Sequence, residues 1–316
     1  MANGHGMCTD DSGRIYYTFD PALPPGQRKG ADMSVLLRWP ADGTGEPEVL
    51  GPTAAARQTL AQGRPHGLIH TNERGAEFLY HINDGKGTES PARIIKTTLE
   101  GEIVWESVGP PVWPGLDYLP TSAVLVPGTE TLLVCDGYGS SFVHGISIVD
   151  GSYISGSSFG KLGHGKANRP GSRDVSWNTN HGIGWNPSKR QLLHCDRVGH
   201  RIVYTDTTGV FVSAIPLSGG MSLPCSVDFS HDGRFYVICS LGDADHPSGK
   251  NPGGCIGIFR QDDDKLVSLL EIDKQLGIDG FDHPHDAVFL PSGDLAFCTW
   301  GTARVAYLRR LNARMQ

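Results

Sequence analysis

The chain has 316 residues, a formal net charge of −7 and 38% hydrophobic residues, so it can bury a core and is not disordered. Nucleic-acid recognition starts from basic patches, and the negative charge therefore argues against a nucleic-acid partner. No apolar run approaches the roughly 20 residues of a membrane span, and the N-terminus lacks the charged and apolar regions of a signal peptide. We therefore predict a cytoplasmic protein with no membrane partner. The sequence leaves the oligomeric state open.

Short apolar runs alternate with turns rich in Gly, Pro, Asp and Ser, a pattern typical of strands joined by hairpins. The clearest such runs, in chain order, are residues 200–204, 211–215, 227–229, 235–239, 287–290 and 295–298. No long helix is predicted, and residues 273–276 form at most a short turn.

One four-residue anchor recurs six times, at residues 4–7, 65–68, 120–123, 180–183, 224–227 and 284–287. Subtraction places the second positions of successive anchors 61, 55, 60, 44 and 60 residues apart. Four strands in each of six such repeats predict an all-β fold, a six-bladed β-propeller with four-stranded antiparallel blades around a central channel. We expect residues 1–316 to form this one domain.

Longer Gly- and Pro-rich insertions interrupt the repeats at residues 20–32, 84–91, 161–175 and 243–254. Loops of this length in a compact domain are usually functional or mobile. We expect them to cover the mouth of the channel.

Histidine occupies the second anchor position of the second, fourth and sixth repeats, as His66, His181 and His285. In a propeller the first strand of each blade lines the channel, so these three imidazoles should converge on the axis. Three protein ligands with one open position are typical of catalytic zinc. The alternative is a set of polar residues that line a hydrated channel.

Two further histidines accompany this set. His5 occupies the equivalent place in the first repeat and could be a fourth ligand, a substrate contact or a channel residue; the last two are favoured. His283 precedes His285 by two residues, so on an extended strand both side chains face the same way. It should border the metal site without completing it.

Two similar turns follow the second strands of the third and fourth repeats and carry Tyr138 and Arg197. A tyrosine is a competent base only when its pKa falls from about 10, and a nearby metal and arginine would lower it. The alternatives are an amphipathic blade-edge residue for Tyr138 and an ion pair with Asp196 for Arg197.

The seven cysteines form no Cys-x-x-Cys pair. Four of them lie near the end of the second apolar run of their repeats. Cysteines at equivalent positions in successive repeats do not easily form disulfide bonds with one another. We interpret them as reduced thiols in the core, which fits a reducing compartment.

The motifs at residues 65–68, 136–138, 180–182, 196–197 and 284–286 together resemble peptidyl-α-hydroxyglycine α-amidating lyase, a six-bladed propeller of the NHL-repeat type. They occur in the family's order and with similar spacing across nearly the whole chain. That family splits a carbinolamide into an amide and an aldehyde.

The resemblance implies catalytic Zn²⁺ on the three alternate histidines, Tyr138 as the base and Arg197 as its electrostatic partner. It also implies a structural Ca²⁺ held by the Asp286 carboxylate and the carbonyls of Leu68 and Met7. Asp286 supports this independently, because it is the only acidic residue in the six anchors and calcium prefers oxygen ligands.

The chain also departs from that family. The family's active-site arginine at the end of the second strand is missing from residues 15–20, and Arg28 in the following loop is the candidate replacement. His5 and His283 are also unusual for that family. The part of the site that would contact the substrate therefore differs from the family's, and we assign His5, His283 and Arg28 to substrate binding.

The sequence therefore predicts a zinc-dependent lyase that cleaves a C–N or C–O bond in a small hydroxylated, carbinolamide-like substrate. A zinc-hydroxide hydrolase or hydratase on the same scaffold is the close alternative. A calcium-dependent lactonase-type propeller fits less well, because such enzymes use mainly carboxylate and Asn ligands. The remaining alternative is a non-catalytic NHL-type binding propeller.

Overall fold

The computed structural model describes residues 3–20, 35–50, 64–85, 91–110, 117–163, 168–242, 253–277, 279–281 and 283–309. Arg28, most of the predicted insertions at residues 20–32, 84–91 and 243–254, and residues 164–167 of the insertion at residues 161–175 lie outside the described residues.

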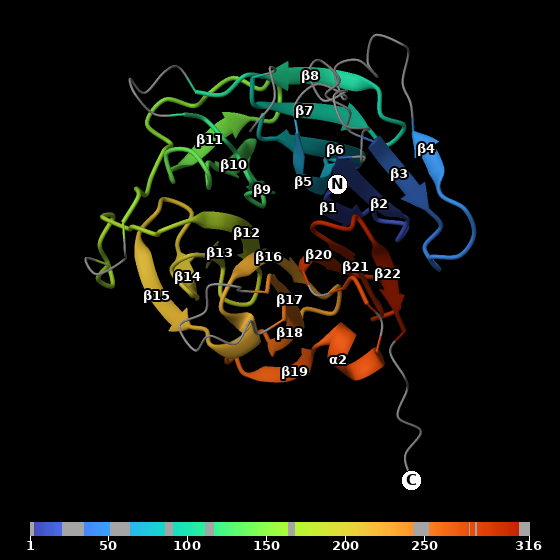
Figure 1. Cartoon of the computed structure of the whole chain (residues 1–316). Coiled ribbons are helices and arrows are strands. Elements are labelled where there is room, and N and C mark those ends of the chain that lie inside the picture. Colours follow the sequence, from blue (N-terminus) through green and yellow to red (C-terminus); the bar gives the residue numbers. More distant parts are fainter. Residues whose placement is uncertain are drawn as a thin grey trace, which may run out of the picture.

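Six small antiparallel sheets stand in a ring around a common axis, which confirms the predicted six-bladed β-propeller (Figure 1). We number these sheets blades 1 to 6 in chain order. The strands of blades 1 to 3 are β1 (Asn3–Thr9), β2 (Ile15–Asp20), β3 (Val35–Trp39), β4 (Glu48–Leu50); β5 (Pro65–Glu73), β6 (Ala76–Asn83), β7 (Arg93–Thr98), β8 (Ile103–Ser107); β9 (Ser122–Leu125), β10 (Thr131–Cys135) and β11 (Val143–Ser147). Those of blades 4 to 6 are β12 (Asn180–Asn186), β13 (Gln191–Asp196), β14 (Arg201–Thr205), β15 (Phe211–Pro216); β16 (Pro224–Phe229), β17 (Phe235–Ser240), β18 (Cys255–Arg260), β19 (Leu266–Leu270); β20 (Pro284–Phe289), β21 (Leu295–Thr299) and β22 (Val305–Leu308).

The first strand of every blade is the innermost, so β1, β5, β9, β12, β16 and β20 line the channel as the repeat predicted (Figure 1). The two predicted hairpins of blades 5 and 6 are present as β16–β17 and β20–β21. Helical structure in the described residues is limited to η1 (Gly219–Met221) and α2 (Ile272–Leu276). None of the described helices is long and apolar enough to cross a membrane.

Two blades differ from the predicted four strands. In the described residues, blades 3 and 6 have three strands each. On the outer side of blade 3, Phe159 and Tyr153 make only isolated bridges to β11, because the chain there turns repeatedly instead of extending. The prediction that residues 1–316 form a single domain stays a prediction.

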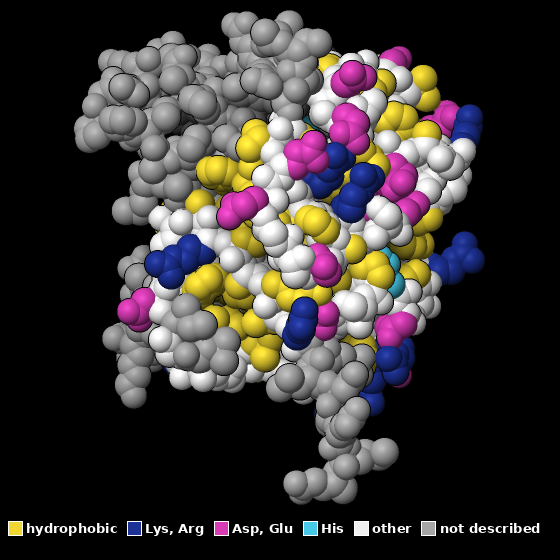
Figure 2. Space-filling view, turned by 90° about the vertical axis from the view of Figure 1, so that its right-hand side faces the viewer, with side chains coloured by type: hydrophobic (Ala, Val, Ile, Leu, Met, Phe, Trp, Pro, Cys, Tyr) yellow, Lys and Arg dark blue, Asp and Glu magenta, His cyan; other side chains and the backbone are white. Residues whose placement is uncertain are grey.

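Apolar clusters fill the space between each pair of neighbouring blades. The last pair closes the ring, because Met7 and Tyr17 of blade 1 pack with Val288 and Cys298 of blade 6. All seven cysteines are free and buried, as predicted. Among the described residues on the face that Figure 2 shows, acidic and basic side chains are interspersed.

Candidate metal centre

A break in strand register sets the direction of the anchor side chains. In β1, β5, β12, β16 and β20 the pairing with the next strand skips one residue, and the skipped residue is the second of the anchor. A β-bulge of this kind leaves one residue out of the ladder and re-aims its side chain. The skipped residues are His5, His66, His181, Cys225 and His285.

Four of these side chains meet on the axis, and we call His5, His66, His181 and His285 the histidine cluster. The centre of the His66 ring lies 4.7 Å from that of His181, 5.2 Å from that of His285 and 5.0 Å from that of His5. His181 and His285 are 5.2 Å apart. All four side chains are buried. The structure thus brings together the three predicted ligands, and His5 with them.

Backbone carbonyls fix the orientation of the three alternate histidines. The Nδ1–H of His66 donates to the Thr121 carbonyl (2.7 Å), that of His181 to the Cys225 carbonyl (2.8 Å), and that of His285 to the His5 carbonyl (2.9 Å). Each bond runs from an even-numbered blade to the second anchor residue of the next blade. Because a carbonyl can only accept, Nδ1 carries the proton and Nε2 keeps its lone pair. This is the usual way in which a protein orients metal-binding histidines.

Burial lowers the pKa of every member of the histidine cluster, and that of His285 falls to about 4. Desolvation is the largest cause for each ring, and for His66 and His5 the neighbouring imidazoles add to it. The four rings are therefore neutral near pH 7. Neutral imidazole is the form that binds metal.

Tyr138 and Arg197 come from equivalent turns after β10 and β13, and buried aspartates hold these turns. Asp196 accepts the backbone N–H of Thr179 and the guanidinium N–H of Arg201. The predicted alternative of an Asp196–Arg197 ion pair is therefore wrong, because Arg201 takes that carboxylate. Arg197 is left to donate from Nη1 to the Tyr138 hydroxyl at 2.9 Å.

The Tyr138 hydroxyl contacts the histidine cluster directly. Its oxygen lies 3.0 Å from Nε2 of His181 and 3.3 Å from Nε2 of His66, both of which can accept its proton. Burial raises the pKa of Tyr138, and the Arg197 guanidinium opposes that rise. The effect of burial on the pKa of Tyr138 is larger than that of Arg197. Arg197 alone therefore does not lower this pKa enough to make a phenolate.

Sequence reasoning missed Arg64, the residue before the Pro65–His66 anchor. Its guanidinium carbon lies 5.9 Å from the centre of the Tyr138 ring, while Arg197 lies 5.0 Å from it. Arg64 also donates to Asp84 through Nε at 2.9 Å, which holds it in place. Its position next to an anchor histidine was the available signal. Arg64 thus supplies positive charge beside Tyr138 where the predicted Arg28 cannot be placed.

The other predicted site residues have less specific surroundings. His283 accepts the Gly242 N–H at Nδ1 (3.2 Å) and makes a ring contact with Trp300 (5.9 Å). Its assignment to substrate binding stays a prediction. Asp286 accepts the Met7 N–H at 2.9 Å, and burial raises its pKa to about 7. A calcium ion between Asp286 and the Met7 and Leu68 carbonyls also stays a prediction.

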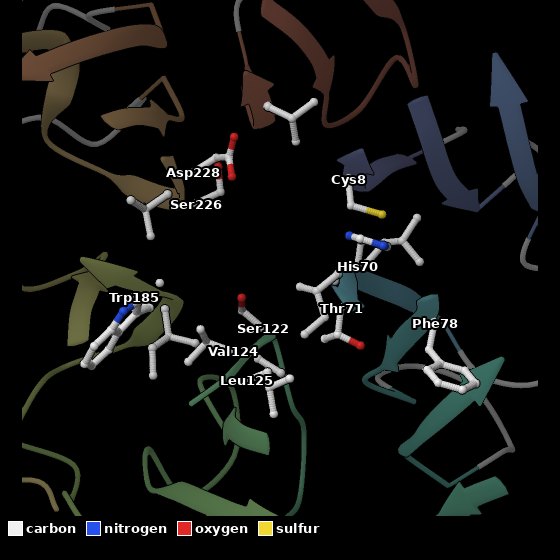
Figure 3. Close-up of a pocket in the computed structure, with 18 of the residues that line it drawn as sticks. Cys8, His70, Thr71, Phe78, Ser122, Val124, Leu125, Trp185, Ser226 and Asp228 are labelled. Atoms are coloured by element: carbon white, nitrogen blue, oxygen red, sulfur yellow. The ribbon is translucent and has the colours of Figure 1, made fainter. Parts of the chain in front are cut away.

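A cavity of about 1000 Å³ runs down the channel from the histidine cluster to Glu73 at the end of β5. In Figure 3 its labelled wall residues come from several inner strands, with Ser122, Ser226 and Asp228 among its polar groups. Tyr138 and Arg197 belong to the turns at the histidine end. The histidine cluster therefore stands between these two side chains and the cavity.

The chain matches no family model and no curated protein. Among solved structures, it is similar to a streptogramin B lyase, with a TM-score of 0.53 at 15% identity over 97% of this chain and 93% of that one. It is also similar to a nidogen/laminin complex (TM-score 0.55, 13% identity, 86% and 81%) and to a protein of unknown function from Bacteroides caccae (TM-score 0.50, 14% identity, 86% and 81%). At such identities the likeness shows the fold alone.

Proposed function

We propose that this protein is a zinc-dependent lyase that cleaves a C–N or C–O bond in a small hydroxylated, carbinolamide-like substrate. The observation that carries the proposal is the set of three buried histidines from alternate blades. Each commits Nδ1–H to a backbone carbonyl, which leaves the lone pair of Nε2 available for a metal. In His66 and His181 this nitrogen lies within hydrogen-bond distance of the Tyr138 hydroxyl. A channel lined merely by hydrated polar groups gives no reason for three rings to be oriented in the same way.

The residues present fit a zinc ion. His66, His181 and His285 would hold it through nitrogen, and three protein ligands leave an open position. A zinc ion held by these three nitrogens would supply Lewis acidity and lower the pKa of a substrate hydroxyl at the open position. The buried His5 nitrogens, which have no hydrogen-bond partner among the described residues, further mark the axis as a place built for a ligand.

Tyr138 is the proposed base, since its hydroxyl lies within 3.3 Å of Nε2 of both His66 and His181. Tyr138 acts as the phenolate, the form that a bound metal and Arg197 together would favour. The hydroxyl proton of the substrate passes to the phenolate oxygen, the C–O bond becomes a carbonyl as the C–N bond breaks, and the proton returns to the departing nitrogen. The products are an aldehyde and an amide, with no other reactant consumed. Arg197 stabilises negative charge as it develops, and its hydrogen bond fixes the Tyr138 oxygen.

The similarity to a streptogramin B lyase adds support, because that protein is named as a lyase and the likeness covers 97% of this chain. The motifs shared with the amidating lyases point the same way. We further propose a structural calcium at Asp286 and a cytoplasmic location. A hydratase or hydrolase on the same residues would release different products, so product analysis separates these reactions.

The test is cleavage of a series of carbinolamides by the zinc-loaded protein, with aldehyde and amide measured separately. Tyr138→Phe should lower kcat by roughly 10²–10⁴-fold, the usual contribution of a general base. Tyr153→Phe is the matched control, because Tyr153 is also half-buried but bonds to Ser158 far from the cluster. Unchanged kcat in Tyr138→Phe, or no cleavage of any carbinolamide by the wild type, would refute the proposal.

A further inference from the structure

The second anchor residues of the three odd-numbered blades share one backbone role. The carbonyls of His5, Thr121 and Cys225 each accept the Nδ1–H of a histidine from the preceding blade. For this role any residue suffices, because only the backbone takes part. The histidine side chain at position 5 therefore needs a separate explanation.

The side chains at these three positions differ in whether they have partners. Thr121 donates its hydroxyl to the Asn180 carbonyl (3.2 Å), and Cys225 donates its thiol to the Leu223 carbonyl (3.3 Å). His5 is 2% exposed, yet among the described residues neither of its ring nitrogens has a hydrogen-bond partner. A buried polar group without a partner is destabilising, so native proteins rarely keep one without a reason.

The neighbours of His5 are other histidines, whose ring nitrogens are groups that bind metal ions. One nitrogen from each of His5, His66 and His285 lies within 4.8 Å of the other two. Two nitrogens bound to one tetrahedral zinc are about 3.4 Å apart, given a Zn–N bond of about 2.1 Å. The three atoms therefore need to move by less than an ångström to share one ion.

We propose that His5 is a fourth ligand of the same metal ion, so that the centre is built from four imidazoles of blades 1, 2, 4 and 6. This rests on the proposed function for the metal itself and adds the ligand set. It replaces the predicted role of His5 as a substrate contact. The pairing of neutral imidazole with a divalent ion satisfies one of the two orphaned nitrogens of His5.

The fourth imidazole changes what the centre can do. With three histidines, a tetrahedral zinc keeps one position for substrate. With four, a substrate oxygen can bind only at a fifth or sixth position. Zinc expands from four to five ligands in some catalytic sites, so a four-histidine zinc centre would take the substrate oxygen as a fifth ligand.

The experiment measures the affinity of the apoprotein for Zn²⁺ by competition with a chelator, and the visible spectrum of the Co²⁺-loaded protein. His5→Ala removes the ligand, and His5→Phe removes the nitrogens while keeping the ring volume. Both should weaken zinc binding by at least the roughly tenfold that loss of an outer partner costs, and both should change the cobalt band in position and intensity. His231→Ala is the control, because His231 is exposed in the turn between β16 and β17 and its Nε2 bonds to the Phe289 carbonyl.

The outcomes separate this inference from the proposed function. If His181→Ala abolishes zinc binding while both His5 variants keep wild-type affinity and spectrum, the function stands and the His5 assignment is wrong. If the wild type binds no zinc or cobalt, both fail. If the His5 variants lose zinc and His181→Ala keeps it, His5 is a ligand and the predicted three-histidine set is the part that is wrong.

Discussion

Asp228 on β16 should make the folded protein less stable as the pH rises from about 4 to about 6. Burial raises its pKa to about 6 in the folded chain, against about 3.9 in an unfolded chain. The folded state therefore binds this proton more tightly, and stability is greatest below the unfolded pKa and falls until the folded pKa is passed. Two units correspond to about 3 kcal/mol. This is an upper limit, because Asp228 faces the water of the cavity and is only half-buried.

The perturbation is Asp228→Asn, which keeps an oxygen to accept the Phe289 N–H (2.7 Å in the wild type) but cannot ionise. Urea unfolding of both proteins, followed by circular dichroism from about pH 4 to about pH 8, gives the difference in the free energy of unfolding. This difference should move in favour of Asp228→Asn by about 1–3 kcal/mol between pH 4 and 6 and then stay constant. A difference that is the same at every pH would refute the reasoning.

Two further predictions concern the core and the turn that carries Arg197. Because all seven thiols are buried and burial raises their pKa, a thiol reagent should find almost no fast-reacting cysteine in the native protein and seven after unfolding in urea; several fast thiols in the native state would contradict this. In Gly199→Ala the added Cβ would clash with the Asp196 carboxylate, so this variant should lose about 1–3 kcal/mol of stability. Gly253→Ala, with open space around it, should lose little, and equal stability of the two variants would argue against the turn geometry.

The repeat of one anchor made the fold predictable. Each anchor starts an inner strand, and the six inner strands follow from six anchors without any knowledge of side-chain contacts. The convergence of His66, His181 and His285 also followed, because equivalent positions in alternate blades must face one axis. The three-stranded blades did not follow, since local apolar pattern does not say whether an outer segment pairs along its length.

The finer structure of the site depends on contacts that sequence does not carry. The bond from each Nδ1–H to the next blade joins residues 44, 55 or 280 positions apart in the sequence. The bulge that turns each anchor residue toward the axis is a property of strand register, which the apolar pattern does not show. Asp196 forms its ion pair with Arg201 and not with Arg197. Both arginines are close to Asp196 in sequence, so only the folded geometry decides which of them pairs with it. The contact of Arg64 with the Tyr138 ring was not predictable, because it is made only when blades 2 and 3 come together.

The central claim is that the three alternate histidines bind one zinc ion. The most direct measurement is the metal content of purified wild type, His181→Ala and the control His231→Ala, by mass spectrometry after equal exposure to zinc. The account predicts one zinc per chain in the wild type and the control, and loss of that zinc in His181→Ala, which otherwise stays folded by circular dichroism. Zinc that is absent from the wild type, or unchanged by His181→Ala, would contradict it.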